Sequence, residues 1–276
     1  MIQPPSILNM GAPGSGKTWA LSSFLANKIR TFVIFTEPNG PDSFIDAIKK
    51  KGLDMELAHW AYLPPASPGW SALRQSGTLA NTLSYKDLSE LKMGVAKSEM
   101  KQLGKLFDLC ENFKCDRTGK SYGPIEILGP ECAFVIDSLS GLNHITMQNT
   151  VGFKPSPHQG EWGIAMGLEE NILLKISADI TSYFVLNCHI SREPDEVVGT
   201  TRLFPAALGS KLGPKVPRFF SEHVLSVRTG DKFLWRTMSG EADLKSRILP
   251  ASQELVPDYT PIIKVYGERV AAAKAA

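Results

Sequence analysis

Short apolar runs alternate along the chain with longer segments in which apolar residues recur at helical spacing. The runs are rich in β-branched and aromatic residues, which is typical of strands buried within a sheet. They predict strands at Ser6–Met10, Thr31–Thr36, Ala133–Ile136 and Tyr183–Asn187. The longer segments predict helices at Lys17–Ile29, Pro41–Lys51 and about Trp162–Asp179.

This alternation predicts an α/β fold, because parallel strands need crossover connections that are usually helical. Two later runs, Val224–Val227 and Phe233–Trp235, flank a turn at Thr229–Gly230–Asp231 and predict an antiparallel pair. We therefore expect a mostly parallel, twisted sheet flanked by helices, with a late antiparallel strand pair.

Residues 54–132 interrupt the alternation, because they are polar and irregular. Within them we predict a long helix at about Ser84–Phe113 and a hairpin through Cys115–Lys120. No clear linker divides the chain. The expected organisation is one domain over 1–276, with an insertion at about 54–132 and a C-terminal extension at about 240–276.

Composition excludes several classes of protein. The chain has 276 residues, 43% of them hydrophobic and 21% charged, which is typical of a folded globular protein. The net charge of +2 excludes a strongly basic surface spread over the whole molecule. No long apolar run predicts a membrane span, the first residues do not resemble a secretory signal, and the four cysteines are expected to stay reduced. These features favour the cytoplasm.

The turn between the first strand and the first helix matches the phosphate-binding motif G-x-x-x-x-G-K-[ST]. Its glycines allow backbone N–H groups to surround phosphate oxygens. Lys17 would reach the β- and γ-phosphates, and the Thr18 hydroxyl would bind Mg²⁺. The alternative is a glycine-rich turn without a ligand. The predicted nucleotide-binding residues are Gly11, Ala12, Pro13, Gly14, Ser15, Gly16, Lys17 and Thr18.

Three polar residues that follow predicted strands complete a candidate catalytic set with Lys17. Asp137 ends an apolar strand and would hold Mg²⁺ together with Thr18. Glu37 follows the second strand and could orient or deprotonate water, or could simply cap the turn after it. His189 lies two residues after Asn187, on the same face of the strand, and could contact the γ-phosphate. A structural histidine is the alternative.

In this order of motifs the sequence resembles the RecA-like P-loop ATPases. That resemblance implies that Glu37 is the hydrolytic base and that His189 is a sensor. Within this group the chain is similar to phage-encoded proteins of the AAA_24 type, including the RecA-like branch of the Sak single-strand annealing proteins. The similarity rests on Val135–Leu142, His158–Gly163 and Leu208–Phe220.

The resemblance also implies two mobile loops on one face, after the Asp137 strand and after the sensor strand. We expect them at 143–161 and 191–217, which are rich in Pro, Gly and Thr and lack a strand pattern. Four basic residues lie between positions 202 and 218, in the second loop and directly after it, with no acidic residue among them. They could contact DNA, could complete a neighbouring subunit's site, or could form an ordinary solvated surface. They are Arg202, Lys211, Lys215 and Arg218.

A second basic stretch contains Lys97, Lys101 and Lys105, which would form one stripe if the segment is helical. The stripe could face DNA or be a solvated helix face.

The expected function is that of an Mg²⁺-dependent ATPase that acts on single-stranded DNA in recombination, annealing or replication. We expect a homo-oligomer, with a single-strand-binding protein as a possible partner, in the cytoplasm of a phage host. One alternative is a ring motor that acts on duplex DNA or protein. Another is an assembly protein that binds ATP and turns it over slowly.

Overall fold

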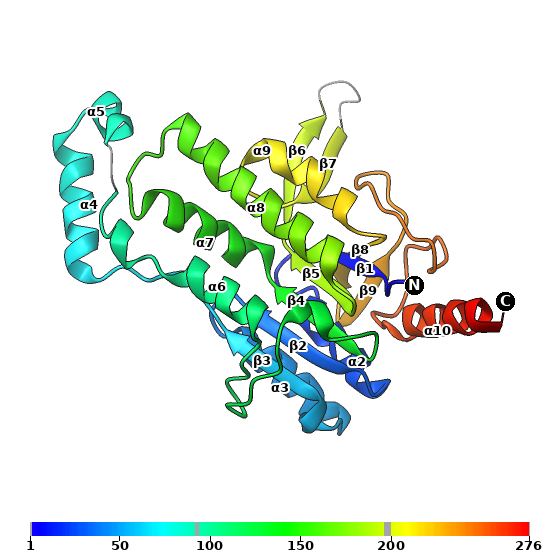
Figure 1. The fold of residues 1–276 in the computed structure, drawn as a ribbon. Helices are drawn as coiled ribbons and strands as arrows, with labels where there is room; N and C mark the ends of the chain where they lie inside the picture. Colours follow the sequence, from blue (N-terminus) through cyan, green and yellow to red (C-terminus); the bar gives the residue numbers. More distant parts are fainter. Residues whose placement is uncertain (1, 92–93, 196–199, 276) are drawn as a thin grey trace.

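A seven-stranded sheet forms the centre of the molecule in the computed structural model, which describes residues 2–91, 94–195 and 200–275 (Figure 1). Its strand order is β3-β2-β4-β5-β1-β8-β9. All neighbours pair in parallel except β8 and β9, which are antiparallel. The strands are β1 (Ser6–Gly11), β2 (Arg30–Phe35), β3 (Ala58–Tyr62), β4 (Cys132–Asp137), β5 (Tyr183–Cys188), β8 (Glu222–Thr229) and β9 (Lys232–Arg236). This confirms the predicted fold class and the late antiparallel pair.

Helices cover both faces of the sheet, so the central strands are buried on both sides. This burial explains why their sequences read as continuous apolar runs instead of alternating ones. Alternate residues of β2 enter opposite cores: Phe32 and Ile34 on one face, Val33 and Phe35 on the other. The first face packs against α6 (Gln102–Glu111), α7 (Leu139–Val151) and α8 (Gln159–Asp179). The second packs against α1 (Lys17–Ala20), α2 (Ser22–Ala26), α3 (Gly40–Lys51) and α10 (Thr260–Ala275).

The region at 54–132 contains an element that the sequence analysis missed. Strand β3 pairs in parallel with β2 and forms one edge of the sheet. Its sequence, Ala-His-Trp-Ala-Tyr, is short and mixes polar with small residues, so its apolar pattern is weak. The predicted hairpin is present, because the backbone N–H of Cys115 donates to the carbonyl of Lys120 across 2.9 Å.

The long helix predicted at Ser84–Phe113 is wrong. The chain forms α5 (Tyr85–Glu90), a 3-10 turn at Lys97–Glu99 and α6, and Ala96 has a positive φ of 55° that no α-helix allows. The predicted lysine stripe is therefore wrong as well, since its three lysines do not share one helix. Helix α4 (Trp70–Thr82) has no buried residue, and together with α5 it projects away from the sheet (Figure 1).

Both predicted loops contain regular structure. Helix α7 fills the first as far as Val151; its N-cap is Ser138, whose hydroxyl accepts from the Ser140 N–H across 3.3 Å. The second contains a hairpin of β6 (Ile190–Asp195) and β7 (Thr200–Pro205), then α9 (Gly209–Leu212). These strands form a separate two-stranded sheet and are polar at many positions, so no apolar pattern marked them. The helix predicted at Lys17–Ile29 is divided at Leu21 into α1 and α2.

Among the described residues, we find no helix with the length and apolar character needed to cross a membrane.

Candidate functional site

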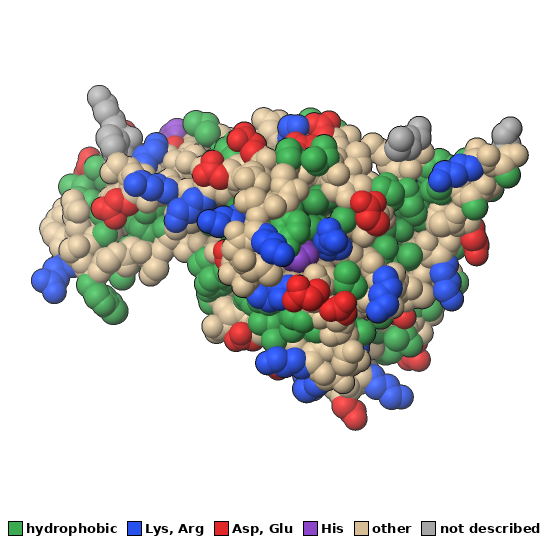
Figure 2. Space-filling view, turned by 60° about the horizontal axis from the view of Figure 1, so that its bottom comes forward, with side chains coloured by type: hydrophobic (Ala, Val, Ile, Leu, Met, Phe, Trp, Pro, Cys, Tyr) green, Lys and Arg blue, Asp and Glu red, His purple; other side chains and the backbone are tan. Residues whose placement is uncertain are grey.

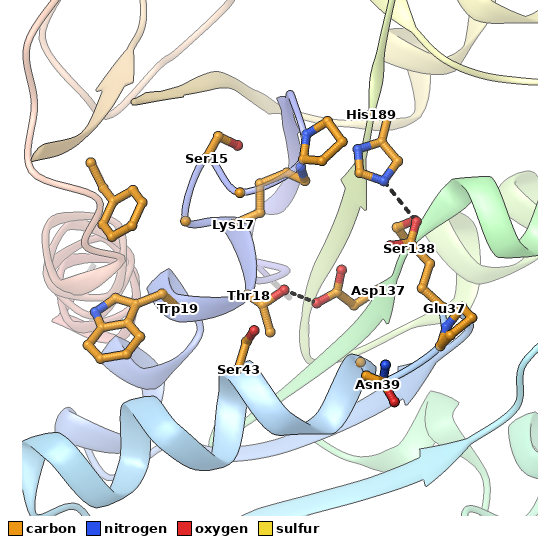
Figure 3. Close-up of a pocket in the computed structure, with 16 residues that line it drawn as sticks. Ser15, Lys17, Thr18, Trp19, Glu37, Asn39, Ser43, Asp137, Ser138 and His189 are labelled. Atoms are coloured by element: carbon orange, nitrogen blue, oxygen red, sulfur yellow. Dashed lines mark hydrogen bonds and ion pairs between the residues drawn. The ribbon is translucent and has the colours of Figure 1, made fainter. Parts of the chain in front are cut away.

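A cavity of about 520 Å³ opens at the carboxyl ends of the central strands (Figure 3). The turn from β1 to α1 forms its floor, and the ends of β2, β4 and β5 form one wall. In parallel α/β sheets this edge is the usual place for a ligand. All four predicted catalytic residues line it: Lys17, Glu37, Asp137 and His189.

The phosphate-binding turn requires glycine at three places. Gly14 and Gly16 have positive φ angles of 71° and 87°, which side chains disfavour. At Gly11 a Cβ atom would lie 2.5 Å from the carbonyl oxygen of Ser226 on β8. The turn is therefore held in a shape that leaves its backbone accessible from the cavity. The Ser15 hydroxyl is buried and has no hydrogen-bond partner among the described residues.

Lys17 lies across this turn, and only 6% of its surface is exposed. Its Nζ donates to the carbonyl oxygens of Gly11, across 2.8 Å, and Ala12, across 3.0 Å. Burial lowers the pKa of Lys17, while the nearby carboxylate of Asp137 opposes that shift. The ammonium group is thus a cation held beside the loop and at least partly desolvated, which strengthens its attraction for an anion.

Asp137 and Thr18 point toward each other in Figure 3, and the Thr18 hydroxyl donates to Asp137 Oδ2 across 2.6 Å. Burial raises the pKa of Asp137, and the hydrogen bond from Thr18 is the largest opposing effect. A hydroxyl and a carboxylate oxygen are hard donors of the kind that Mg²⁺ prefers. Among the described residues no group of three or more His, Cys, Asp or Glu side chains could cage a metal. The donors fit Mg²⁺ bound jointly with ligand phosphates, which is its usual mode.

Glu37 and His189, which the sequence analysis treated separately, form one pair. His189 Nε2 lies 2.9 Å from Glu37 Oε1, and the Ser138 hydroxyl donates to the same oxygen. The hydrogen bond to His189 lowers the pKa of Glu37 to about 2, partly offset by burial. The carboxylate is therefore ionised at neutral pH and is a weak base. It is better suited to accept a hydrogen bond from water than to remove a proton.

The structure adds residues to the cavity that sequence reasoning missed. Trp19 directly follows the motif, and Lys50 and Lys51 each lie 5.6 Å from the centre of its ring. Phe233 comes from β9 and contacts the turn so closely that a Cβ at Gly16 would lie 2.9 Å from its ring. Trp19 could have been identified from the sequence, because it directly follows the phosphate-binding motif. Phe233 is far away in sequence, and no local pattern marked it.

The four basic residues at 202–218 do not line this cavity. Their stretch lacks acidic residues in sequence, but the fold supplies them. Arg202 pairs with Asp243 across 3.0 Å, Lys215 lies 3.4 Å from Glu170, and Arg218 also pairs with Glu170. Lys211 is exposed. Acidic residues distant in sequence therefore neutralise part of the positive charge of this stretch.

Both basic and acidic side chains are spread over the face shown in Figure 2, and several basic ones follow one another from its upper left to its middle. Lys and Arg side chains lie on both sides of a hollow near its middle, where a histidine is visible, and acidic side chains lie just below. The surface is thus mixed in charge, in line with the small net charge of the chain.

Comparisons with known proteins identify similar folds only. Neither a scan against known protein families nor a search of curated proteins finds a match. Among solved structures the chain is similar to the RadB recombinase, with 12% identity, a TM-score of 0.41 and coverage of 87% of this chain and 84% of that one. A Pyrococcus horikoshii protein gives 10% identity, a TM-score of 0.36 and coverage of 93% and 94%.

A third similar structure is an ATPase from the type III secretion system of pathogenic bacteria. It gives 12% identity and a TM-score of 0.35, with coverage of 82% of this chain and 52% of that one. The chain therefore spans about half the length of that ATPase.

Proposed function

We propose that this chain is an Mg²⁺-dependent ATPase of the RecA-like P-loop type. The observation that carries the proposal is the contact of Thr18 with Asp137 beside the cation of Lys17, at the mouth of a complete phosphate-binding turn. Helix α1 supplies Lys17 and Thr18, and β4, more than 100 residues later, supplies Asp137 to the same cavity. A glycine-rich turn without a ligand would not need this convergence of a cation, a carboxylate and a hydroxyl.

In the proposed mechanism, each group has a separate task. The turn's backbone N–H groups and Lys17 hold the phosphates, and Thr18 and Asp137 hold Mg²⁺. The metal, when bound, neutralises charge that develops on the phosphate oxygens. Glu37 orients the attacking water, and His189 holds the Glu37 carboxylate in place and senses the γ-phosphate. We further propose that Trp19 and Phe233 contact the base, because both line the same cavity.

The proposed substrate is single-stranded DNA, in recombination, annealing or replication, and the proposed origin is a phage whose host cytoplasm contains the protein. Support comes from the sequence resemblance to the phage AAA_24 and Sak-type proteins. We propose a homo-oligomer as the active form, with a single-strand-binding protein as partner.

We propose that residues 1–276 form one domain. Two contacts support this organisation. Strand β3, from the insertion at 54–132, pairs within the main sheet. Ile262 and Tyr266 of α10, in the C-terminal extension, belong to the core, where the rings of Tyr266 and Tyr183 lie 5.5 Å apart.

A second candidate is an assembly protein that binds ATP and turns it over slowly. The low pKa of Glu37, fixed by His189 and Ser138, favours it, because a weak base held by two partners is slow to activate water. The two candidates share the nucleotide site and differ in turnover.

Calorimetric titration with a non-hydrolysable ATP analogue, with and without Mg²⁺, tests the site itself. We expect Mg²⁺-dependent binding that Lys17→Ala weakens by about 10- to 100-fold, because a charge-assisted bond to phosphate is lost. Lys49→Ala, an exposed lysine on α3, is the matched control and should bind as the wild type does. Equal binding by Lys17→Ala and the wild type would refute the nucleotide site.

A further inference from the structure

A second cavity, of about 330 Å³, lies against the phosphate-binding turn. It shares Pro13, Gly14 and Ser15 with the nucleotide cavity. Its other walls come from β6, β7, β8 and β9, and Glu37, Asp137 and His189 do not line it. The same turn therefore borders two cavities, and the mechanism above uses only one of them.

Three arginines line this second cavity: Arg192 on β6, Arg228 on β8 and Arg236 on β9. Glu241 is the single acidic residue of its lining, and none of the three arginines forms an ion pair within the described part of the chain. Arg228 donates to the carbonyl oxygen of Gly230 across 3.0 Å. We call this the arginine cavity.

The guanidinium group of Arg236 is the clearest sign of a missing ligand. Its Nε atom is buried and has no hydrogen-bond partner in the described residues. A buried donor on a charged group is costly when it is left unpaired. The Ser15 hydroxyl, on the shared turn, is also buried and unpartnered. An anion with several acceptor oxygens would satisfy such donors.

The chemistry of the cavity favours phosphate groups. Arginine binds phosphate through two parallel N–H bonds, which a planar fork provides and a lysine does not. Three arginines against one glutamate leave a net charge of +2 in the lining, more than one phosphodiester neutralises. Ile190, Leu203 and Leu225 form an apolar part of the lining, and the Ser226 hydroxyl is already bonded to Asn9 and Trp235, so few side chains remain to identify a base.

We propose that the arginine cavity binds the phosphate backbone of a nucleic-acid strand, independently of its base sequence. This deepens the proposed function and rests on it, because it gives the DNA a place beside the nucleotide. The connection between the two cavities is short. His189 contacts Glu37 in the nucleotide cavity. Ile190, which follows His189, lines the arginine cavity, and so does Arg192 two residues later. A nucleic-acid strand that binds in the arginine cavity and moves β6 would therefore act on the nucleotide site through His189 and through the shared turn.

The test measures binding of a fluorescein-labelled oligothymidylate by anisotropy at several salt concentrations. We expect Arg236→Gln and Arg192→Gln each to weaken binding by about 5- to 30-fold. Each loss of a phosphate contact should reduce the slope of log K against log salt by about 0.7. Lys264→Gln, an exposed lysine on α10, is the charge-matched control and should bind as the wild type does.

Two further measurements separate the possible outcomes. Binding of a fluorescent ATP analogue should stay within about twofold of wild type in both arginine variants, since this cavity is not the nucleotide site. Arg236→Lys keeps the charge without the fork and should bind the oligonucleotide less tightly than wild type and more tightly than Arg236→Gln. A thermal melt of each variant checks that it is folded.

The proposal is overturned if the folded arginine variants bind the oligonucleotide as tightly as wild type, or if wild type does not bind it. It is also overturned if the variants lose only inorganic triphosphate binding, which would indicate a small phosphate ligand. A changed oligomer mass with unchanged DNA binding would indicate an acidic side chain of a neighbouring copy instead. Failure of the ATP analogue to bind wild type would refute the proposed function separately.

Discussion

Glu169 offers a sharp test of how α7 and α8 pack against each other. It lies on α8, fully buried, facing α7 and the backbone near Leu208. Thr146 Oγ1 is 3.5 Å from its Oε2, a long contact, and its Oε1 has no hydrogen-bond partner in the described residues. Burial raises the pKa of Glu169 to about 8, and the Leu208 backbone opposes this only in part. The carboxyl group is therefore mostly neutral in the folded protein at pH 7.

The raised pKa of Glu169 sets the sign and the size of its effect on the free energy of unfolding. Below the ordinary glutamate pKa of 4.5, both folded and unfolded chains hold the proton, so Glu169 adds no pH dependence. Between 4.5 and about 8, unfolding releases the proton, and the free energy of unfolding falls by about 1.4 kcal/mol per pH unit. From pH 5 to pH 8 the loss reaches about 4 kcal/mol. Above the folded pKa the penalty is constant.

Glu169→Gln keeps the shape of the side chain and cannot ionise. We expect its free energy of unfolding, relative to wild type, to rise by about 4 kcal/mol between pH 5 and pH 8. Urea denaturation at each pH measures this. Glu170→Gln, which removes the neighbouring partner of Lys215 and Arg218, is the control because it takes a glutamate charge from the same helix. A pH-independent difference for Glu169→Gln would refute the reasoning.

Three substitutions test the nucleotide site. Thr18→Val leaves the buried carboxylate of Asp137 without its hydrogen bond from Thr18. In urea titrations it should lower the free energy of unfolding by about 1–3 kcal/mol, whereas Thr18→Ser, which keeps the hydroxyl, should not. Gly16→Ala places a Cβ at φ 87° and 2.9 Å from an aromatic ring, so it should cost about 1–2 kcal/mol in backbone strain alone and abolish nucleotide binding in calorimetry. His189→Gln removes the main cause of the low pKa of Glu37, which should rise from about 2 toward 4.5 in a carbon NMR titration; an unchanged pKa would contradict the pairing.

The central sheet and the phosphate-binding turn could be predicted from the sequence because their signals are local. Strands buried on both faces are continuous apolar runs, and the turn's glycines, lysine and threonine occupy fixed positions. Asp137 and Glu37 were predicted in the same way, as polar residues at strand ends. The fold places Asp137 and Glu37 in the lining of one cavity with the phosphate-binding turn.

What the sequence could not provide depends on contacts between distant residues. The segment of β3 has a weak apolar pattern and forms a strand by pairing with β2. The polar strands β6 and β7 pair with each other outside the main sheet. Basic residues at 202–218 form ion pairs with acidic residues of other parts of the chain. The pairing of Glu37 with His189 joins residues 152 positions apart, so neither residue's setting could be read locally.

The central claim is that this chain hydrolyses ATP at the Lys17 turn under the control of a DNA strand. Steady-state hydrolysis with Mg²⁺, measured without DNA, with single-stranded DNA and with duplex DNA, tests it most directly, with Lys17→Ala and Glu37→Gln beside the wild type. We expect single strands to stimulate the wild type most, and both variants to lose about a hundredfold or more in rate. Normal hydrolysis by Lys17→Ala, or wild-type turnover that stays slow and indifferent to DNA, would contradict the claim.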